Sequence, residues 1–140
     1  MIRTLIVRLE AVPTWGNGLL CRWGIAAVFW RSGQTKVHDF FVINDSTYDL
    51  FKDEYKVPLL PPETAAVLAT VSEHLFSVLL VIGLASRLSA GALFFMTLVI
   101  EIFIYPDSWP DHLMWAAAMV YVILRGPGKM SLDHLIAKRV

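Results

Sequence analysis

Long apolar segments alternate with short polar connections along this chain, and the most continuous of them runs from Thr64 to Leu84. Apolar residues fill this segment as a block, whereas a helix on the surface of a soluble protein has a single apolar stripe. A helix rises about 1.5 Å per residue, so about 20 residues cover the roughly 30 Å of hydrocarbon in a bilayer. The pattern therefore predicts a transmembrane helix at 64–84.

Further apolar segments predict three more transmembrane helices, at 18–36, 88–105 and 110–125. The first of these is the least regular, because Arg22 and Lys36 lie near its ends, and both side chains are expected to extend to the membrane interfaces. An amphipathic hairpin lying in the interface is the alternative for this segment. A very short turn separates 64–84 from 88–105, so these two helices are predicted to be antiparallel neighbours.

The remaining segments are predicted to hold smaller elements. Residues 1–12 place apolar side chains on one stripe, which predicts a helix lying in the membrane interface. The connection 37–63 is polar but rich in aromatic residues, so we expect an ordered loop with a short helix near 47–55. A tail, 126–140, follows the last span. The predicted fold is all-α: one membrane domain, residues 1–140, built as a bundle of four transmembrane helices.

Composition agrees with a membrane protein and removes other classes. Hydrophobic residues make up 56% of the 140 residues, above the value of about 45–50% that is usual for soluble domains. Twelve basic residues balance twelve acidic ones, so charge gives no reason to expect nucleic-acid binding. The single cysteine, Cys21, excludes an intramolecular disulfide and a CxxC redox pair. A redox role would therefore need a borrowed cofactor or a partner.

The distribution of charge predicts how the bundle is inserted. Lys and Arg are concentrated in the N-terminal segment, in the turn at 85–87 and after residue 124, whereas most acidic residues lie in 37–63 and 106–111. Cytoplasmic segments of membrane proteins are enriched in Lys and Arg. We therefore predict that both termini are cytoplasmic and that loop 37–63 is extracytoplasmic.

Polar residues inside the predicted helices are the candidates for chemistry. Counted from the helix ends, six of them fall at similar depths in the outer half of the bilayer: Arg31, Gln34, Glu73, His74, Glu101 and His112. A charge in hydrocarbon costs a few kcal/mol, so these side chains are expected to turn inward and to find partners. Glu73 and Arg31 are the candidate catalytic residues. The other four are candidate contacts of a quinone or solute in a shared cavity.

Two other interpretations of this cluster stay open. Glu73 paired with Arg31 or Lys36 is equally consistent with a structural ion pair that fixes the register of the helices. Two carboxylates and two imidazoles also suit a metal ion, but no ExxH or HxxxH spacing occurs on one predicted helix. We therefore predict no metal site.

Several motifs resemble those of the DoxX family, small four-helix membrane proteins of bacteria. They are SGQTK at the end of the first span, the proline-rich approach 58–62, SEHLFSVLLVIGLASRLSA, and GPGKMSLDHLIA near the C-terminus. The positions that match are Ser32, Gly33, Gln34, Lys36, Glu73, Gly83, Arg87, Gly126, Gly128, Ser131 and Asp133. The resemblance covers about residues 20–137. It implies a multi-pass protein of the inner membrane. The family is named after a subunit of a thiosulfate:quinone oxidoreductase, and other members are linked to thiol-stress assemblies, so the resemblance also implies a role in membrane redox chemistry.

The resemblance and the polar cluster together favour a membrane subunit of an oxidoreductase assembly with a quinone as cofactor. Loop 37–63 is the expected docking surface for a redox partner, and self-association is a further expectation. A non-catalytic scaffold, organising partners through the small-residue faces of 88–105 and 110–125, is the alternative. A small-solute transporter is a third hypothesis. Whether the chain is itself an enzyme stays open.

Overall fold

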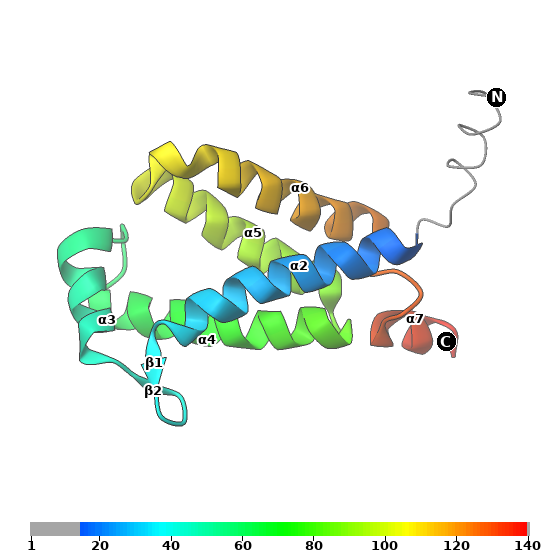
Figure 1. Ribbon diagram of the computed structural model, residues 1–140, viewed down its shortest axis with the longest axis horizontal. Helices are drawn as coiled ribbons and strands as arrows, with labels where there is room; N and C mark the ends of the chain where they lie inside the picture. Colours follow the sequence, from blue (N-terminus) through cyan, green and yellow to red (C-terminus); the bar gives the residue numbers. More distant parts are fainter. Residues whose placement is uncertain (1–14, 140) are drawn as a thin grey trace.

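Figure 1 shows the computed structural model of the protein, which describes residues 15–139. Four long helices dominate the described part: α2 (Trp15–Gln34), α4 (Pro62–Ile82), α5 (Ser86–Phe103) and α6 (Trp109–Arg125). They correspond to the four predicted spans, with ends displaced by a few residues. The interfacial helix predicted at 1–12 lies outside the described residues.

Shorter elements connect the long helices and follow the last one. They are strands β1 (Val37–His38) and β2 (Val42–Ile43), helix α3 (Asp45–Leu50), a π-helical turn (Phe51–Tyr55), a 3-10 turn (Pro106–Ser108) and the C-terminal helix α7 (Leu132–Ala137). All of those before α4 belong to the loop 37–63. This loop is therefore structured along most of its length.

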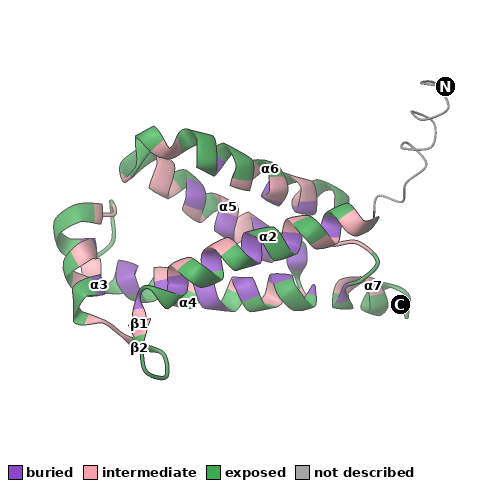
Figure 2. Cartoon of the chain, in the orientation of Figure 1, coloured by how far each residue is buried: buried purple, intermediate pink, exposed green. Residues whose placement is uncertain are grey.

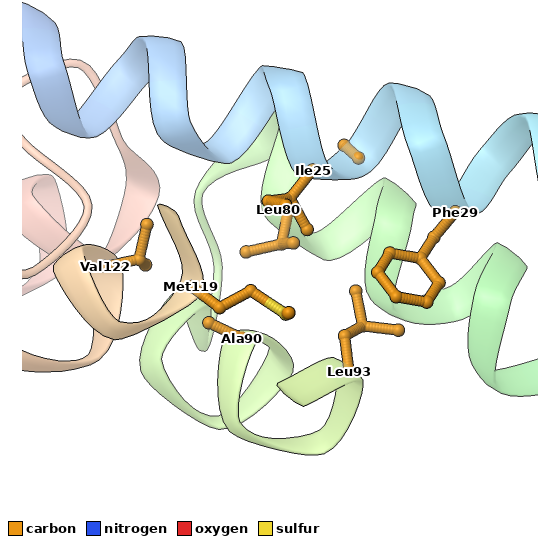
Figure 3. Packing of buried hydrophobic residues seen from close by; sticks show 8 residues of the cluster. Ile25, Phe29, Leu80, Ala90, Leu93, Met119 and Val122 are labelled. Atoms are coloured by element: carbon orange, nitrogen blue, oxygen red, sulfur yellow. The ribbon is translucent and has the colours of Figure 1, made fainter. Parts of the chain in front are cut away.

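The four long helices pack side by side around one hydrophobic core. Contacts join α2 to α4, α4 to α5, α5 to α6, and α6 back to α2. Figure 3 shows the core side chains meeting from all four helices: Ile25, Phe29, Leu80, Ala90, Leu93, Met119 and Val122. This core fixes the rotation of each helix, and so determines which polar residues face inward.

The outer faces of the long helices are exposed and apolar (Figure 2). Among the described residues, α4 and α5 are the two helices long and apolar enough to cross a membrane. The helix α6 has 17 residues, and α2 carries Arg22 and Arg31. Soluble monomers rarely expose apolar surface of this extent, whereas a bilayer covers it. Crossing of the membrane by all four helices stays a prediction.

Arg22 joins three segments at the end of the molecule where α4 turns into α5. Its side chain is completely buried, and it donates hydrogen bonds to the carbonyl oxygens of Leu80, Pro127 and Met130 at 2.6, 3.0 and 2.6 Å. The last carbonyls of a helix have no partner within the helix, so Arg22 satisfies part of the end of α4. The expectation that Arg22 extends to the interface is wrong, because backbone carbonyls take the place of water.

The C-terminal tail is fastened to the same end. The Asp133 carboxylate accepts hydrogen bonds from the amides of Ala85 and Ser86 at 2.7 and 2.8 Å, which caps the start of α5. Gly83 has a φ of 73°, and a Cβ there would lie 2.5 Å from the Cβ of Ser131. Both the left-handed backbone and the close approach of the tail therefore require glycine.

The connection between α2 and α4 folds over the opposite end of the long helices. Strands β1 and β2 form a small antiparallel hairpin, in which Val37 lies opposite Ile43. Strands of two residues are too short to leave an alternating pattern, so the sequence did not predict them. The helix expected near 47–55 begins at Asp45 and becomes π-helical at Phe51. Phe51 is buried against α4 at Ala65 and Ala66, so the loop packs on the helix that carries Glu73.

Candidate functional site

A cavity of about 460 Å³ lies between the long helices at the end covered by loop 37–63. Most of its wall is aliphatic or aromatic. Apart from two tyrosines, its polar side chains are Ser32, Lys36, Ser72, Glu73 and His112. Small-molecule sites are typically apolar pockets of about 300–1,000 Å³ with a few convergent polar groups. The cavity has this form, and it is the strongest candidate site in the described part of the chain.

A buried ion pair supplies the polar part of the wall. The Lys36 Nζ donates to both oxygens of the Glu73 carboxylate at 2.9 Å. Ser32 completes the group, because its Oγ accepts from Lys36 at 3.0 Å and donates to Glu73 Oε1 at 3.1 Å. The Lys36 and Glu73 side chains are 9% and 3% exposed. Since the two charges cancel, the cavity presents a polar surface that carries no net charge at this point.

The lysine reaches Glu73 because the chain turns back directly after α2. The Lys36 amide donates to the carbonyl of Gly33 at 3.0 Å. The Lys36 carbonyl accepts from the amide of Asn44 and the hydroxyl of Thr47, both at 3.0 Å. These bonds hold the lysine backbone between the end of α2 and the start of α3. Both partners of the ion pair are thus fixed by ordered backbone, and the expectation that Lys36 extends to the interface is wrong.

His74 does not line the cavity. Its Nδ1 lies 2.7 Å from the carbonyl oxygen of Thr70, and its Nε2 lies 3.0 Å from the side-chain nitrogen of Gln34. A carbonyl only accepts, so the neutral ring with a proton on Nδ1 satisfies both contacts, with Gln34 donating to Nε2. The rings of Trp30 and Phe41 pack against the imidazole with centroids 5.1 and 4.9 Å away. His74 and Gln34 therefore join α4, α2 and the hairpin, and neither lines the cavity.

His112 and Glu101 form a second polar pair. The His112 Nδ1 donates to Glu101 Oε2 at 2.5 Å, and the imidazole packs against the ring of Trp115 at 4.9 Å. His112 lines the cavity, whereas Glu101 contacts it only through the histidine. Because Nδ1 is engaged by the carboxylate, Nε2 is the ring nitrogen left to meet a ligand.

Arg31 is exposed and does not line the cavity. The inward-facing side of α2 is set by Phe29, which lies in the core, and by Ser32, which lies on the cavity wall. At 100° per residue, Arg31 projects from a different side of the helix. The expected pairing of Glu73 with Arg31 is therefore wrong, and Lys36, the other cation considered, is the partner.

A model of the DoxX family matches residues 18–106. The chain belongs to the DoxX family. It is accordingly a membrane protein, and the expected family is confirmed. The motif near the C-terminus lies outside the matched range, so its resemblance stays a prediction. An uncharacterized protein of Haemophilus influenzae is 28% identical to this DoxX protein in an alignment of 141 residues that covers 94% of this chain and 90% of the relative. No solved structure matches this chain.

The range matched to DoxX includes the ion pair and Glu101 but ends before His112. The motif positions divide between two ends of the molecule. Ser32, Lys36 and Glu73 build the wall of the cavity, whereas Gly83 and Asp133 hold the tail against the α4–α5 turn. In this DoxX chain the positions near Glu73 thus build the candidate site, whereas Gly83 and Asp133 contribute to stability.

Sequence reasoning missed Ser32 as a member of the ion-pair group. A signal was present, because Ile25, Phe29 and Ser32 follow one another at i, i+4 and i+7, on the side of α2 that proves to be buried. The six predicted site residues do not form a single cluster: they separate into Glu73, the His74–Gln34 contact, the His112–Glu101 pair and the exposed Arg31. In the part of the chain that the structure describes, no three His, Cys, Asp or Glu side chains come together as metal ligands.

Proposed function

We propose that this DoxX protein is a membrane subunit of an oxidoreductase assembly and that its cavity binds a quinone. In this proposal all four long helices cross the inner membrane, with both termini in the cytoplasm and the cavity in the outer half. The observation that carries the proposal is the uncharged polar group of Ser32, Lys36 and Glu73 in an otherwise apolar cavity.

The residues fit a quinone better than a charged solute. An anion would meet a lysine that is already neutralised by Glu73, and a cation would meet a carboxylate that is already neutralised by Lys36. A ring with two carbonyl oxygens needs apolar walls and hydrogen-bond donors at its rim. The apolar lining supplies the walls. Lys36 and Ser32 already donate within the ion-pair group, so each donates to a ring carbonyl only by exchanging one of those hydrogen bonds. His112 donates through Nε2 once that nitrogen is protonated. When bound, a quinone supplies two-electron, two-proton chemistry.

His112 is the residue placed to exchange a proton with such a ligand. Its Nδ1 donates to Glu101, so its Nε2 accepts a proton from a hydroxyl or, once protonated, donates to a carbonyl oxygen. The Glu101 carboxylate orients the ring and stabilises the imidazolium, as a carboxylate behind a catalytic histidine generally does. His112 has the proposed role in proton exchange, and Lys36 and Glu73 the role of holding the head group.

The distribution of charge supports the proposed orientation. Arg87, Arg125 and Lys129 lie at the end where Arg22 and Asp133 hold the tail. The opposite end carries loop 37–63, which is rich in acidic residues. Since cationic ends face the cytoplasm, loop 37–63 faces outward and is the proposed docking surface for a redox partner.

The proposal is tested by quinone binding and electron transfer in the purified protein. A variant that retains Trp115 as its single tryptophan reports binding, because this residue lines the cavity and a quinone quenches its fluorescence. The matched comparison is Lys36→Met/Glu73→Leu, which removes the polar group but leaves no unpaired charge. Loss of charge-assisted hydrogen bonds of about 1.5–3 kcal/mol predicts affinity lower by about tenfold or more.

The control is Arg31→Gln, which removes an exposed cation from the same helix and is expected to leave the affinity within about twofold of the parent protein. Electron transfer is measured after reconstitution with the proteins that copurify in mild detergent. If the double variant is folded and neither quinone binding nor electron transfer changes, the proposal is wrong. Retained association with those partners in that case would favour the non-catalytic scaffold.

A further inference from the structure

We infer that the cavity opens sideways between α4 and α5 into the hydrocarbon of the bilayer, and that the ligand keeps its tail in this mouth while its head group lies inside. The inference rests on the proposed function and deepens it. It names the class of ligand: an uncharged ring head group on a long apolar chain, taken up from the membrane and not from water.

The exposed side chains of the cavity wall locate the mouth. Leu68 on α4 and Phe95 on α5 both line the cavity, yet they are 50% and 68% exposed. The cavity residues of the other two long helices are at least partly covered: Val28, Phe29, Ser32 and Lys36 on α2, and His112 and Trp115 on α6. Leu60 and Tyr105, at the outer end of the cavity, are less exposed, at 42% and 39%. The widest opening of the wall therefore lies on the side shared by α4 and α5.

The arrangement of these two helices agrees with this position. A tight turn at Gly83 joins them at one end, and Figure 1 shows them diverging from that turn toward the end covered by α3. The buried core residues of these two helices, Leu80 on α4 and Ala90 and Leu93 on α5, lie in the halves of the helices nearest to the connection. Farther from the turn, the cavity takes the place of direct packing between the two helices.

The outer loop closes the route toward water. The Tyr105 hydroxyl donates to Glu54 Oε1 at 2.7 Å, and its ring packs against Tyr55 with centroids 5.6 Å apart. Hydrogen bonding with Tyr55, burial and the Glu54 carboxylate all raise the pKa of Tyr105, so its hydroxyl remains a donor throughout the physiological range. Phe51 is buried beneath these contacts. The loop thus covers most of the outer end of the cavity, where Leu60 and Tyr105 are partly exposed, and leaves the wider mouth at its side.

The surroundings of the mouth identify the phase that it faces. Both helices that form it are long and apolar enough to cross a membrane. From Thr64 to Ile82 the only ionisable side chains of α4 are Glu73 and His74, and both are buried. The exposed surface of α4 beside Leu68 is therefore apolar, so lipid chains and not water cover this side of the proposed bundle.

The size of the cavity requires such an exit for a membrane quinone. A volume of about 460 Å³ lies in the lower part of the range for drug-sized ligands. It accommodates a substituted ring and the first part of a side chain, whereas a chain of many isoprenoid units has to continue outside. The apolar mouth lets that chain remain in the hydrocarbon without exposing it to water.

The test closes the mouth reversibly and compares two quinones. Leu68→Cys and Phe95→Cys are combined in a Cys21→Ser background, and a bifunctional thiol reagent that forms cleavable disulfides bridges the two positions. The probes are a dimethoxy-methyl-benzoquinone without a tail and the same ring with a long isoprenoid tail, both followed by quenching of Trp115. Each single-cysteine variant, which carries the reagent without a bridge, is the control.

We expect the bridge to weaken binding of the long-tailed quinone by about tenfold or more, to leave the tailless ring within about twofold, and to be reversed by a reductant. Leu68→Phe, which narrows the mouth without any reagent and leaves Trp115 as the single tryptophan, is expected to have the same selective effect. Equal binding of the long-tailed quinone with and without the bridge, and by Leu68→Phe, would overturn the side mouth while leaving the proposed function intact. Failure of both quinones to bind the unbridged protein would overturn the two together.

Discussion

Removing the cation from the buried ion pair is the perturbation with the clearest expected result. In Lys36→Met the Glu73 carboxylate keeps the hydrogen bond from Ser32 but loses both contacts with the ammonium group. Glu73 is 3% exposed, so water does not replace the lysine without rearrangement of the helices. The carboxylate is then left either charged and unpaired or protonated in the folded protein.

The expected cost is about 3–5 kcal/mol of the free energy of unfolding, which is typical for a buried ion pair from which one partner is removed. The double variant Lys36→Met/Glu73→Leu removes both charges at similar side-chain volumes. Apolar replacement of a whole buried pair is often neutral or stabilising by about 1–4 kcal/mol. The double variant is therefore expected to be at least as stable as the parent protein, and much more stable than Lys36→Met.

The assay is equilibrium unfolding of the purified protein in mixed micelles, with the four proteins of the double-mutant cycle measured under one set of conditions. Arg31→Met provides the control, because it removes an exposed cation of the same helix and is expected to change the free energy of unfolding by less than about 0.5 kcal/mol. A cost below about 1 kcal/mol for Lys36→Met, or equal costs for Lys36→Met and Arg31→Met, would refute the buried, mutually dependent pair.

Three further changes test other parts of the structure in the same unfolding assay. Gly33→Ala places a Cβ 2.7 Å from Cε1 of His74 and is expected to lower the free energy of unfolding by about 1–3 kcal/mol. Its control is Gly24→Ala, whose Cβ has no atom within 4 Å and which is expected to be neutral or slightly stabilising. Equal effects of the two variants would contradict the close contact of α2 with the imidazole. Arg22→Met leaves buried carbonyls without donors and is expected to cost at least about 3 kcal/mol, and a change below about 1 kcal/mol would show that water reaches them. Asp133→Ala removes the cap of α5 and is expected to lower the free energy of unfolding by about 0.5–2 kcal/mol and to speed proteolysis of the tail. An unchanged cleavage rate would argue against docking of α7.

The sequence was informative where one physical signal dominated. Continuous apolar segments predicted the positions of the four long helices, because a helix is one of the few structures that pair all backbone amides and carbonyls within hydrocarbon. The buried carboxylate of Glu73 was identified for a similar reason, since an ionisable group in a transmembrane segment needs a partner. The family was recognisable from its motifs, and the match to DoxX over residues 18–106, which include the motif around Glu73, confirms the family.

Contacts between distant segments were harder to predict. Depth in the bilayer indicated which polar residues lie in one layer, but not which side of each helix turns inward. Arg31 and Lys36 were both available to Glu73, and the choice depends on the backward turn after α2 that Asn44 and Thr47 hold. Arg22 was expected at the interface because it lies near the end of the predicted helix. Its carbonyl partners come from residues far apart in the sequence, so its burial was not predictable. A pattern read along the chain contains no information on such three-dimensional contacts.

Photolabelling by a quinone determines whether the head group lies in the cavity. A quinone with a photoactivatable group on its ring is added to the protein in lipid vesicles and irradiated, and the modified residues are identified by mass spectrometry. The account predicts labelling of α4 around Glu73 and of α6 between His112 and Trp115, abolished by excess unlabelled quinone and absent in Lys36→Met/Glu73→Leu. Labels confined to exposed side chains such as Leu113 and Leu124, undiminished by competition, would contradict it.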